Sequence, residues 1–165
     1  MPVNDPLLAA FREDHAVLGR GFHDLSQSLR ARDIRAARTA AHHLDTMAGA
    51  HIAFEERYFY PSLIPLLGGD EVERLLHEHE HGLGAIREIL AISDRGTVQE
   101  SQWDALLERS QEMEQHIAEC GELFGVMGRI VPVEREALYQ LLLKLRREAP
   151  RWTDFAANGA PEAIC

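Results

Sequence analysis

The 165-residue sequence has little cysteine, no long apolar run and a deficit of positive charge. Its two cysteines, Cys120 and Cys165, are too few for a disulfide scaffold, which favours a reducing, cytoplasmic location. No run of about 18 apolar residues is present, so no transmembrane helix is expected. The first residues also lack the pattern of a secretory signal. The net charge of −10 argues against binding to nucleic acid or to a membrane surface.

Proline is absent between residues 7 and 60 and between residues 66 and 131. Because proline is excluded from helix interiors, these gaps leave room for long helices. Valine and threonine are scarce and apolar residues recur every three or four positions, which favours helix over strand. We predict an all-α fold: an up-down-up-down four-helix bundle over residues 1–131, with a short fifth helix and a flexible tail over residues 132–165.

The expected second helix starts near Asp33, is disturbed at Pro61 and Pro65, and stops at two consecutive glycines. The tail is expected to fray from Thr153 onwards. The fifth helix carries a leucine-rich face that packs either on the bundle or on a second subunit, which would give a homodimer. That face consists of Leu138, Leu141, Leu142 and Leu145.

Histidine is the residue in excess, because the chain has nine and none lies beyond residue 116. Each of the four long helices places one histidine on its own apolar stripe. A single histidine on such a stripe is usually a hydrogen-bonded core residue. Four of them in one core would leave many polar atoms unsatisfied unless they share a metal, and bundle cores are a known location for such sites. The four histidines are His15, His51, His79 and His116.

The second helix adds a carboxylate to this set. His51 and Glu55 are four residues apart, so the imidazole and the carboxylate lie on the same helix face. Glu55 would be costly in the core without a partner. Glu56 points about 100° away from Glu55 and is expected in solvent. Tyr58 is expected either to donate a hydrogen bond to a metal-bound group or to fill the core.

The third helix offers three histidines, His77, His79 and His81. His77 and His81 share a face, but only His79 is in phase with the apolar residues of its helix. We therefore choose His79 for the core and expect the other two to flank it or to lie on the surface. Whether either of them replaces or joins His79 stays open.

A short internal repeat relates the second and fourth helices. The segment His51–Phe59 aligns without gaps on His116–Phe124, and both copies begin with His-Ile-Ala. In the second copy Cys120 stands where Glu55 stands in the first. Three interpretations of Cys120 remain: a small buried apolar residue, a thiolate ligand that favours zinc or thiolate-bound iron, or the mark of an empty, degraded site.

Together these features resemble the hemerythrin-like, HHE cation-binding family over roughly residues 5–128. The resemblance is carried by His15, the segment 51–61, the pair Glu78-His79, and His116. It implies a four-helix bundle that holds an oxo- or hydroxo-bridged non-haem di-iron centre. The family normally has a second bridging carboxylate where this chain has Cys120 and Gly121. The metal-site residues expected here are His15, His51, Glu55, His79, His116 and Cys120.

The resemblance implies a protein that binds or senses a small diatomic ligand, oxygen or nitric oxide, or peroxide. Two alternatives stay open. One is a redox enzyme at the same centre, a ferroxidase or a reductase of peroxide or nitric oxide. The other is a mononuclear or zinc-bound regulatory domain, because Cys120 replaces the second bridge. We expect a metal- and oxygen-binding protein rather than an enzyme.

Overall fold

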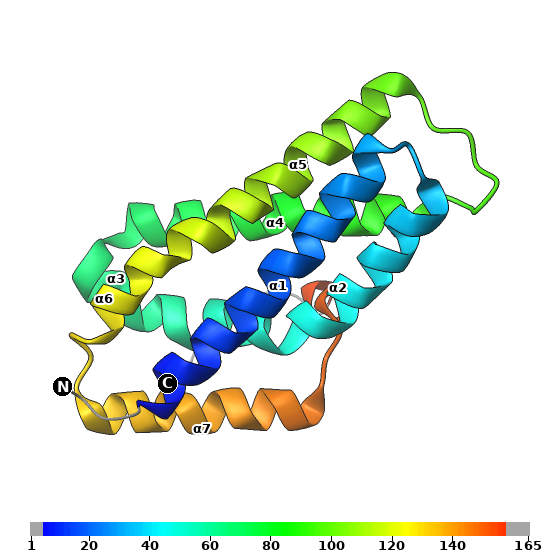
Figure 1. Ribbon diagram of the computed structural model, residues 1–165. Coiled ribbons are helices and arrows are strands. Elements are labelled where there is room, and N and C mark those ends of the chain that lie inside the picture. Colours follow the sequence, from blue (N-terminus) through cyan, green and yellow to red (C-terminus); the bar gives the residue numbers. More distant parts are fainter. Residues whose placement is uncertain (1–4, 158–165) are drawn as a thin grey trace.

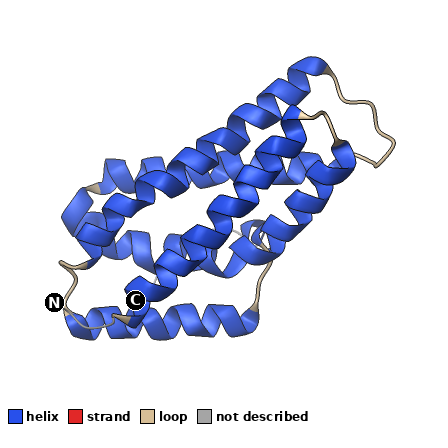
Figure 2. Ribbon diagram, viewed as in Figure 1, coloured by secondary structure: helices blue, strands red, loops and turns tan. Residues whose placement is uncertain are grey.

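The computed structural model describes residues 5–157, and no β-strand occurs within that range (Figure 2). The predicted all-α class is therefore confirmed. The helical elements are α1 (Pro6–Arg30), α2 (Ile34–Phe54), the π-helical turn η1 (Glu55–Phe59), α3 (Tyr60–Leu67), α4 (Gly69–Ala91), α5 (Glu100–Glu119), the 3-10 turn η2 (Cys120–Glu122), α6 (Leu123–Met127), α7 (Pro132–Glu148) and α8 (Trp152–Ala157).

Side-chain caps define where the first two helices begin. Asp5 precedes α1, and its carboxylate accepts hydrogen bonds from the backbone N–H groups of Leu7 and Leu8 at 3.0 and 3.2 Å. Asp33 precedes α2 and accepts from the N–H of Ala36 at 3.0 Å. These bonds satisfy donors that have no partner inside the helix. The second helix therefore starts where the sequence predicts.

The long helices form a closed ring of contacts (Figure 1). α1 packs against α2 and α5, and α4 packs against the same two helices. The stripe of α1 that sequence periodicity predicts is buried in full, with His15 at 8% exposed among its apolar neighbours. Those neighbours are Leu7, Phe11, Leu18, Phe22, Leu25 and Leu29. None of the helices within residues 5–157 combines the length and the hydropathy needed to cross a membrane.

The second long segment changes its helical form before Pro61. α2 passes into the π turn η1, in which the N–H of Tyr60 donates to the carbonyl of Glu55, and α3 then continues to Leu67. Proline has no N–H to donate and its ring crowds the carbonyl four residues earlier, so a regular α-helix is disfavoured here. The expected disturbance is confirmed before Pro61, with Glu55 at its start, whereas Pro65 lies inside α3, which continues past it.

α7 and α8 pack on the outside of this ring. α7, orange in Figure 1, contacts α1 and α2. Three of its leucines, Leu138, Leu142 and Leu145, are buried within the chain. Its leucine-rich face thus lies on the bundle, which is one of the two predicted arrangements.

The expectation of a frayed tail from Thr153 is wrong for the residues up to Ala157. Trp152 opens α8 and is 1% exposed. Thr153 donates from its N–H and its hydroxyl to the carboxylate of Asp45, at 2.8 and 3.1 Å. The buried indole and the two hydrogen bonds order this segment, although its composition alone predicts no order. Residues 158–165, with Cys165, lie outside the described residues.

The docking of α8 generates a prediction about Gly49 of α2. A Cβ atom at this position would collide with the carbonyl oxygen of Pro150, just before α8. Gly49→Ala should lower the free energy of unfolding by about 1–3 kcal/mol, because the backbone of residues 150–151 must move. Urea unfolding at fixed metal content measures it. Gly125→Ala is the control, because its Cβ meets nothing within 4 Å. Equal stability of the two variants would contradict the close contact.

Candidate metal centre

Four histidines converge from four helices on one carboxylate. His15, His51, His79 and His116 come from α1, α2, α4 and α5, and none of them is more than 8% exposed. The carboxylate is that of Glu55, which is 1% exposed. The structure thus brings together all six residues that the sequence predicts for a metal site, since Cys120 lies beside these five, and their role as ligands stays a prediction.

The two carboxylate oxygens of Glu55 face different pairs of histidines. Oε1 lies 3.1 Å from Nε2 of His51 and 3.8 Å from Nε2 of His15. Oε2 lies 3.3 Å from Nε2 of His79, which is itself 3.1 Å from Nε2 of His116. Glu55 therefore separates two groups of nitrogen donors, as a carboxylate that bridges two metal ions would.

The outer nitrogen of each imidazole has an oxygen acceptor. His51 donates from Nδ1 to Asp14 at 3.0 Å. His79 donates from Nδ1 to Glu56 at 3.0 Å. With Nδ1 engaged in this way, each Nε2 is the atom left to face the centre.

The same holds for the other two histidines. His116 donates from Nδ1 to Glu78 at 2.5 Å, and His15 donates from Nδ1 to the carbonyl of Phe11 at 2.8 Å. A hydrogen bond of this kind fixes the tautomer and the ring orientation of a metal-ligating histidine.

Two of these carboxylates are held in turn by arginines. Arg146 of α7 donates to Asp14 at 2.7 Å, on the oxygen that His51 does not use. Arg74 of α4 donates to Glu78. A chain of arginine, carboxylate and imidazole thus leads from partly exposed positions to each half of the cluster.

The charges within the cluster explain its pKa shifts. Burial lowers the pKa of His51 and of His79, but the adjacent carboxylates outweigh it and raise both to about 9. Burial and the charge of His51 lower the pKa of His15 to about 4. Burial and His79 lower the pKa of His116. Burial opposes the charge of Glu55, yet His51 and His79 hold its pKa well below the ordinary value. Without a metal, two imidazolium ions therefore flank one buried carboxylate.

The donor atoms fit a bound cation. Nε2 of His51 and Oε1 of Glu55 are both buried, and within the described residues neither has a hydrogen bond of acceptable geometry. A metal ion would satisfy both atoms and would replace the protons of the flanking imidazolium ions. Imidazole with carboxylate suits iron and zinc. Two sets of three residues have their donor atoms within 4.8 Å of one another inside each set. One set is His15, Glu55 and Cys120, and the other is Glu55, His79 and His116.

Cys120 lies at the edge of the cluster. It is 2% exposed, and its Sγ is 3.7 Å from Nε2 of His116. Burial and the charge of Glu55 raise the pKa of its thiol far above the ordinary value. The sulfur is therefore a neutral thiol in the absence of a metal, and a coordinated cation would be needed to make it a thiolate.

The remaining histidines lie where the sequence places them. His79 is 1% exposed, whereas the side chains of His77 and His81 are 64% and 50% exposed. The choice of His79 for the core is therefore confirmed. His23, His42 and His43 are exposed, as expected.

One expectation about the second segment is wrong. Glu56 does not simply face solvent, because it accepts the hydrogen bond from His79. Tyr58 is partly buried and packs against the core, which agrees with one of its two expected roles. Tyr60 is buried more fully, and its hydroxyl lies 3.3 Å from Nε2 of His79. The π turn η1 places more residues in a turn than an α-helix and shifts the phase of the residues after it, Tyr60 among them.

Asp14 and Glu78 accept hydrogen bonds from core histidines, and sequence reasoning predicts neither contact. A signal exists: each is adjacent in sequence to a core histidine, as Glu56 is adjacent to Glu55. Each of these three acids accepts a hydrogen bond from the core histidine of the long helix that follows it in the chain, not from its own sequence neighbour. Adjacency alone does not reveal the partner, since that depends on how the helices pack.

Comparison with known proteins agrees with this geometry. A family model of the hemerythrin HHE cation-binding domain matches residues 7–147, from the first turn of α1 to the last turn of α7. Such a domain implies that the chain binds a metal ion. No curated protein and no solved structure matches the chain. On the family match, the chain belongs to the hemerythrin HHE cation-binding domain family.

Proposed function

We propose that this chain is an up-down-up-down four-helix bundle that holds a non-haem di-iron centre and binds or senses oxygen, nitric oxide or peroxide. The position of Glu55 carries the proposal. Its carboxylate lies between His15 and His51 on one side and His79 and His116 on the other. Two ions could share such a carboxylate while each takes two imidazole nitrogens.

The protein's own groups prepare this site. Bound iron would supply coordination and redox chemistry toward a small oxidant or diatomic ligand. The outer acceptors hold the imidazoles in one orientation, so that little reorganisation is needed when a cation arrives. Phe11 packs at 4.3 Å from the ring of His15 and at 4.9 Å from that of His51, which excludes water from that side. Tyr60 offers a hydroxyl beside His79.

Cys120 favours a second candidate, a mononuclear or zinc-bound regulatory domain. Its sulfur lies within 4.8 Å of donor atoms of His15 and Glu55. A thiolate, an imidazole and a carboxylate form a ligand set that suits zinc. Metal analysis with an optical spectrum separates the candidates, since two irons with an oxo-bridge absorption band support the first and one zinc without a visible band supports the second. Stopped-flow mixing of the reduced protein with oxygen then separates reversible binding from enzymatic turnover.

The first prediction for this function compares two histidines of α4. His79→Gln should lower the iron content per chain by at least half of the wild-type value, because it removes a buried donor that faces Glu55. His77→Gln should leave the iron content unchanged, since His77 is on the exposed face of the same helix. Iron quantified per folded chain measures both. Equal losses in the two variants would contradict the site.

A second prediction concerns Asp14, which holds His51 from outside the cluster. Asp14→Asn should weaken metal binding by about 10- to 100-fold, because an amide orients and polarises the imidazole less strongly than a carboxylate. Competition with a chelator of known affinity measures the change. Asp24→Asn is the matched control on α1, since Asp24 is exposed. An unchanged affinity in Asp14→Asn would show that the hydrogen bond to His51 does not act on the metal.

A third prediction tests the missing bridge. If Cys120 merely replaces a carboxylate, Cys120→Glu should raise the iron content toward two ions per chain and stabilise the loaded protein against heat. The physical reason is that a second carboxylate adds negative charge beside His116 and His15, where the wild-type thiol is neutral. Unchanged metal content would count against the loss of a bridge at this position.

A further inference from the structure

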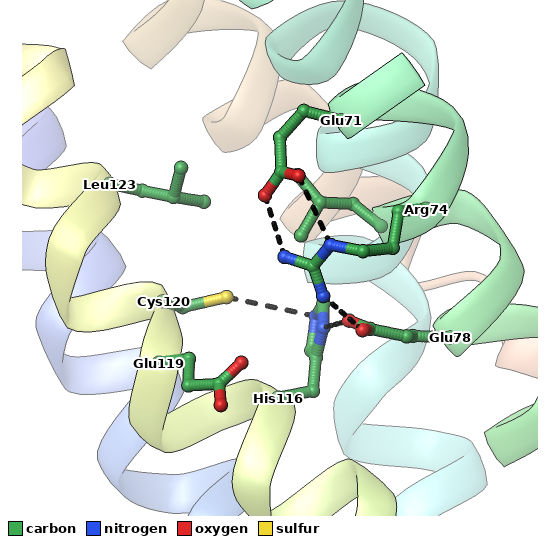
Figure 3. Close-up of a pocket in the computed structure, with 8 residues that line it drawn as sticks. Glu71, Arg74, Glu78, His116, Glu119, Cys120 and Leu123 are labelled. Carbon is green, nitrogen blue, oxygen red and sulfur yellow. Dashed lines mark hydrogen bonds and ion pairs between the residues drawn. The ribbon is translucent and has the colours of Figure 1, made fainter. Parts of the chain in front are cut away.

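A cavity of about 280 Å³ reaches the cluster from the side of α4 (Figure 3). It lies between α4 and the junction where α5 passes through η2 into α6. Leu75 and Leu123 form its apolar walls. The polar groups of its lining are Glu71, Arg74, Glu78, Glu119, His116 and Cys120.

The inner end of this cavity is formed by residues of the candidate metal centre. His116 lines it, and this imidazole lies 3.1 Å from His79 and donates to Glu78 at the cavity wall. Cys120 is almost fully buried and directs its sulfur toward the same imidazole (Figure 3). The cavity therefore ends on donor atoms that face the centre.

The side of the cluster around His15 is covered by aromatic rings. Phe124 stands 6.0 Å from the ring of His15 and 5.8 Å from that of Phe11, and Phe11 packs in turn on Phe59 at 5.0 Å. A hydrated cation would have to lose its water to pass such a surface, which is unfavourable. The polar cavity beside His116 is the side on which an ion could keep oxygen ligands throughout its approach.

The charge of the cavity lining is negative. Three carboxylates face one guanidinium, which leaves two negative charges in excess. Arg74 pairs with Glu71 at 2.6 Å and also with Glu78. Glu119 accepts a hydrogen bond from the neutral side chain of Gln115, so its charge is not offset by that contact. Clefts lined by charge of one sign concentrate ions of the other sign and raise association rates.

We propose that this cavity is the route by which a divalent cation reaches the centre, with Glu119 and Glu71 attracting the hydrated ion and Glu78 and His116 receiving it. The inference rests on the proposed metal centre. It adds the path by which the metal ion enters and the charged residues that attract the ion along it. It assigns Glu119 a role in the rate of loading rather than in the final complex, because its carboxylate lies outside the groups of donor atoms around Glu55.

The test measures how fast the metal-free chain takes up Co²⁺, followed by its absorption in a stopped-flow instrument over a series of salt concentrations. Glu119→Gln should slow uptake at low ionic strength by roughly two- to tenfold, and Glu119→Lys should slow it further. Both variants should make the rate of Co²⁺ uptake depend less on salt concentration, since surface charges are screened over about 10 Å at 0.1 M salt. The equilibrium stoichiometry should equal that of the wild-type chain.

The matched controls are Glu73→Gln and Glu73→Lys, which change the same charges at an exposed position of α4 outside the cavity lining. They should leave the rate within a factor of about two of the wild-type value. Equal rates for the Glu119 and Glu73 variants, with normal stoichiometry, would overturn the access route and leave the metal centre standing. Failure of the wild-type chain to bind Co²⁺ at equilibrium would overturn the centre, and the route with it.

Discussion

The rest of the structure depends on satisfying four imidazoles and one carboxylate that are buried in a helical core. Each imidazole brings two nitrogens, and a buried nitrogen without a partner is costly. The two nitrogens of each ring have different partners. The outer nitrogens donate hydrogen bonds to oxygen acceptors on the bundle, and the inner ones face Glu55. Without a metal, the inner nitrogens of His51 and His79 carry protons that repel the neighbouring imidazoles, and a cation at the centre would replace that repulsion with coordination.

The acceptors also connect the helices to one another. Asp14 of α1 holds the histidine of α2, Glu56 of η1 holds that of α4, and Glu78 of α4 holds that of α5. Each of these hydrogen bonds joins two neighbouring segments of the bundle. The orientation of each imidazole therefore depends on the distance between the two segments that its hydrogen bond joins. Arg146 extends the first contact to α7, which therefore has a direct connection to the centre through Asp14.

Periodicity predicts the features that depend on one helix alone. The burial of His15 and of His79, and the exposure of His77, follow from their phase within a helix, and the structure agrees. The partners of Asp14 and Glu56 depend on which helices are neighbours and at what rotation, which a single helix does not encode. The fuller burial of Tyr60 than of Tyr58 escapes the same reasoning, because a regular period of 3.6 residues fails inside a π turn.

The internal repeat ends in two different structures, and this difference makes the centre asymmetric. After His51 the chain widens into the π turn η1 and places Glu55 between both pairs of histidines. After His116 it tightens into the 3-10 turn η2 at Cys120. A thiol there contributes no charge, so the negative charge on that side comes from the cavity wall, where Glu78 stands beside His116. On the proposed route, that wall is where a charged ligand from outside would meet the centre.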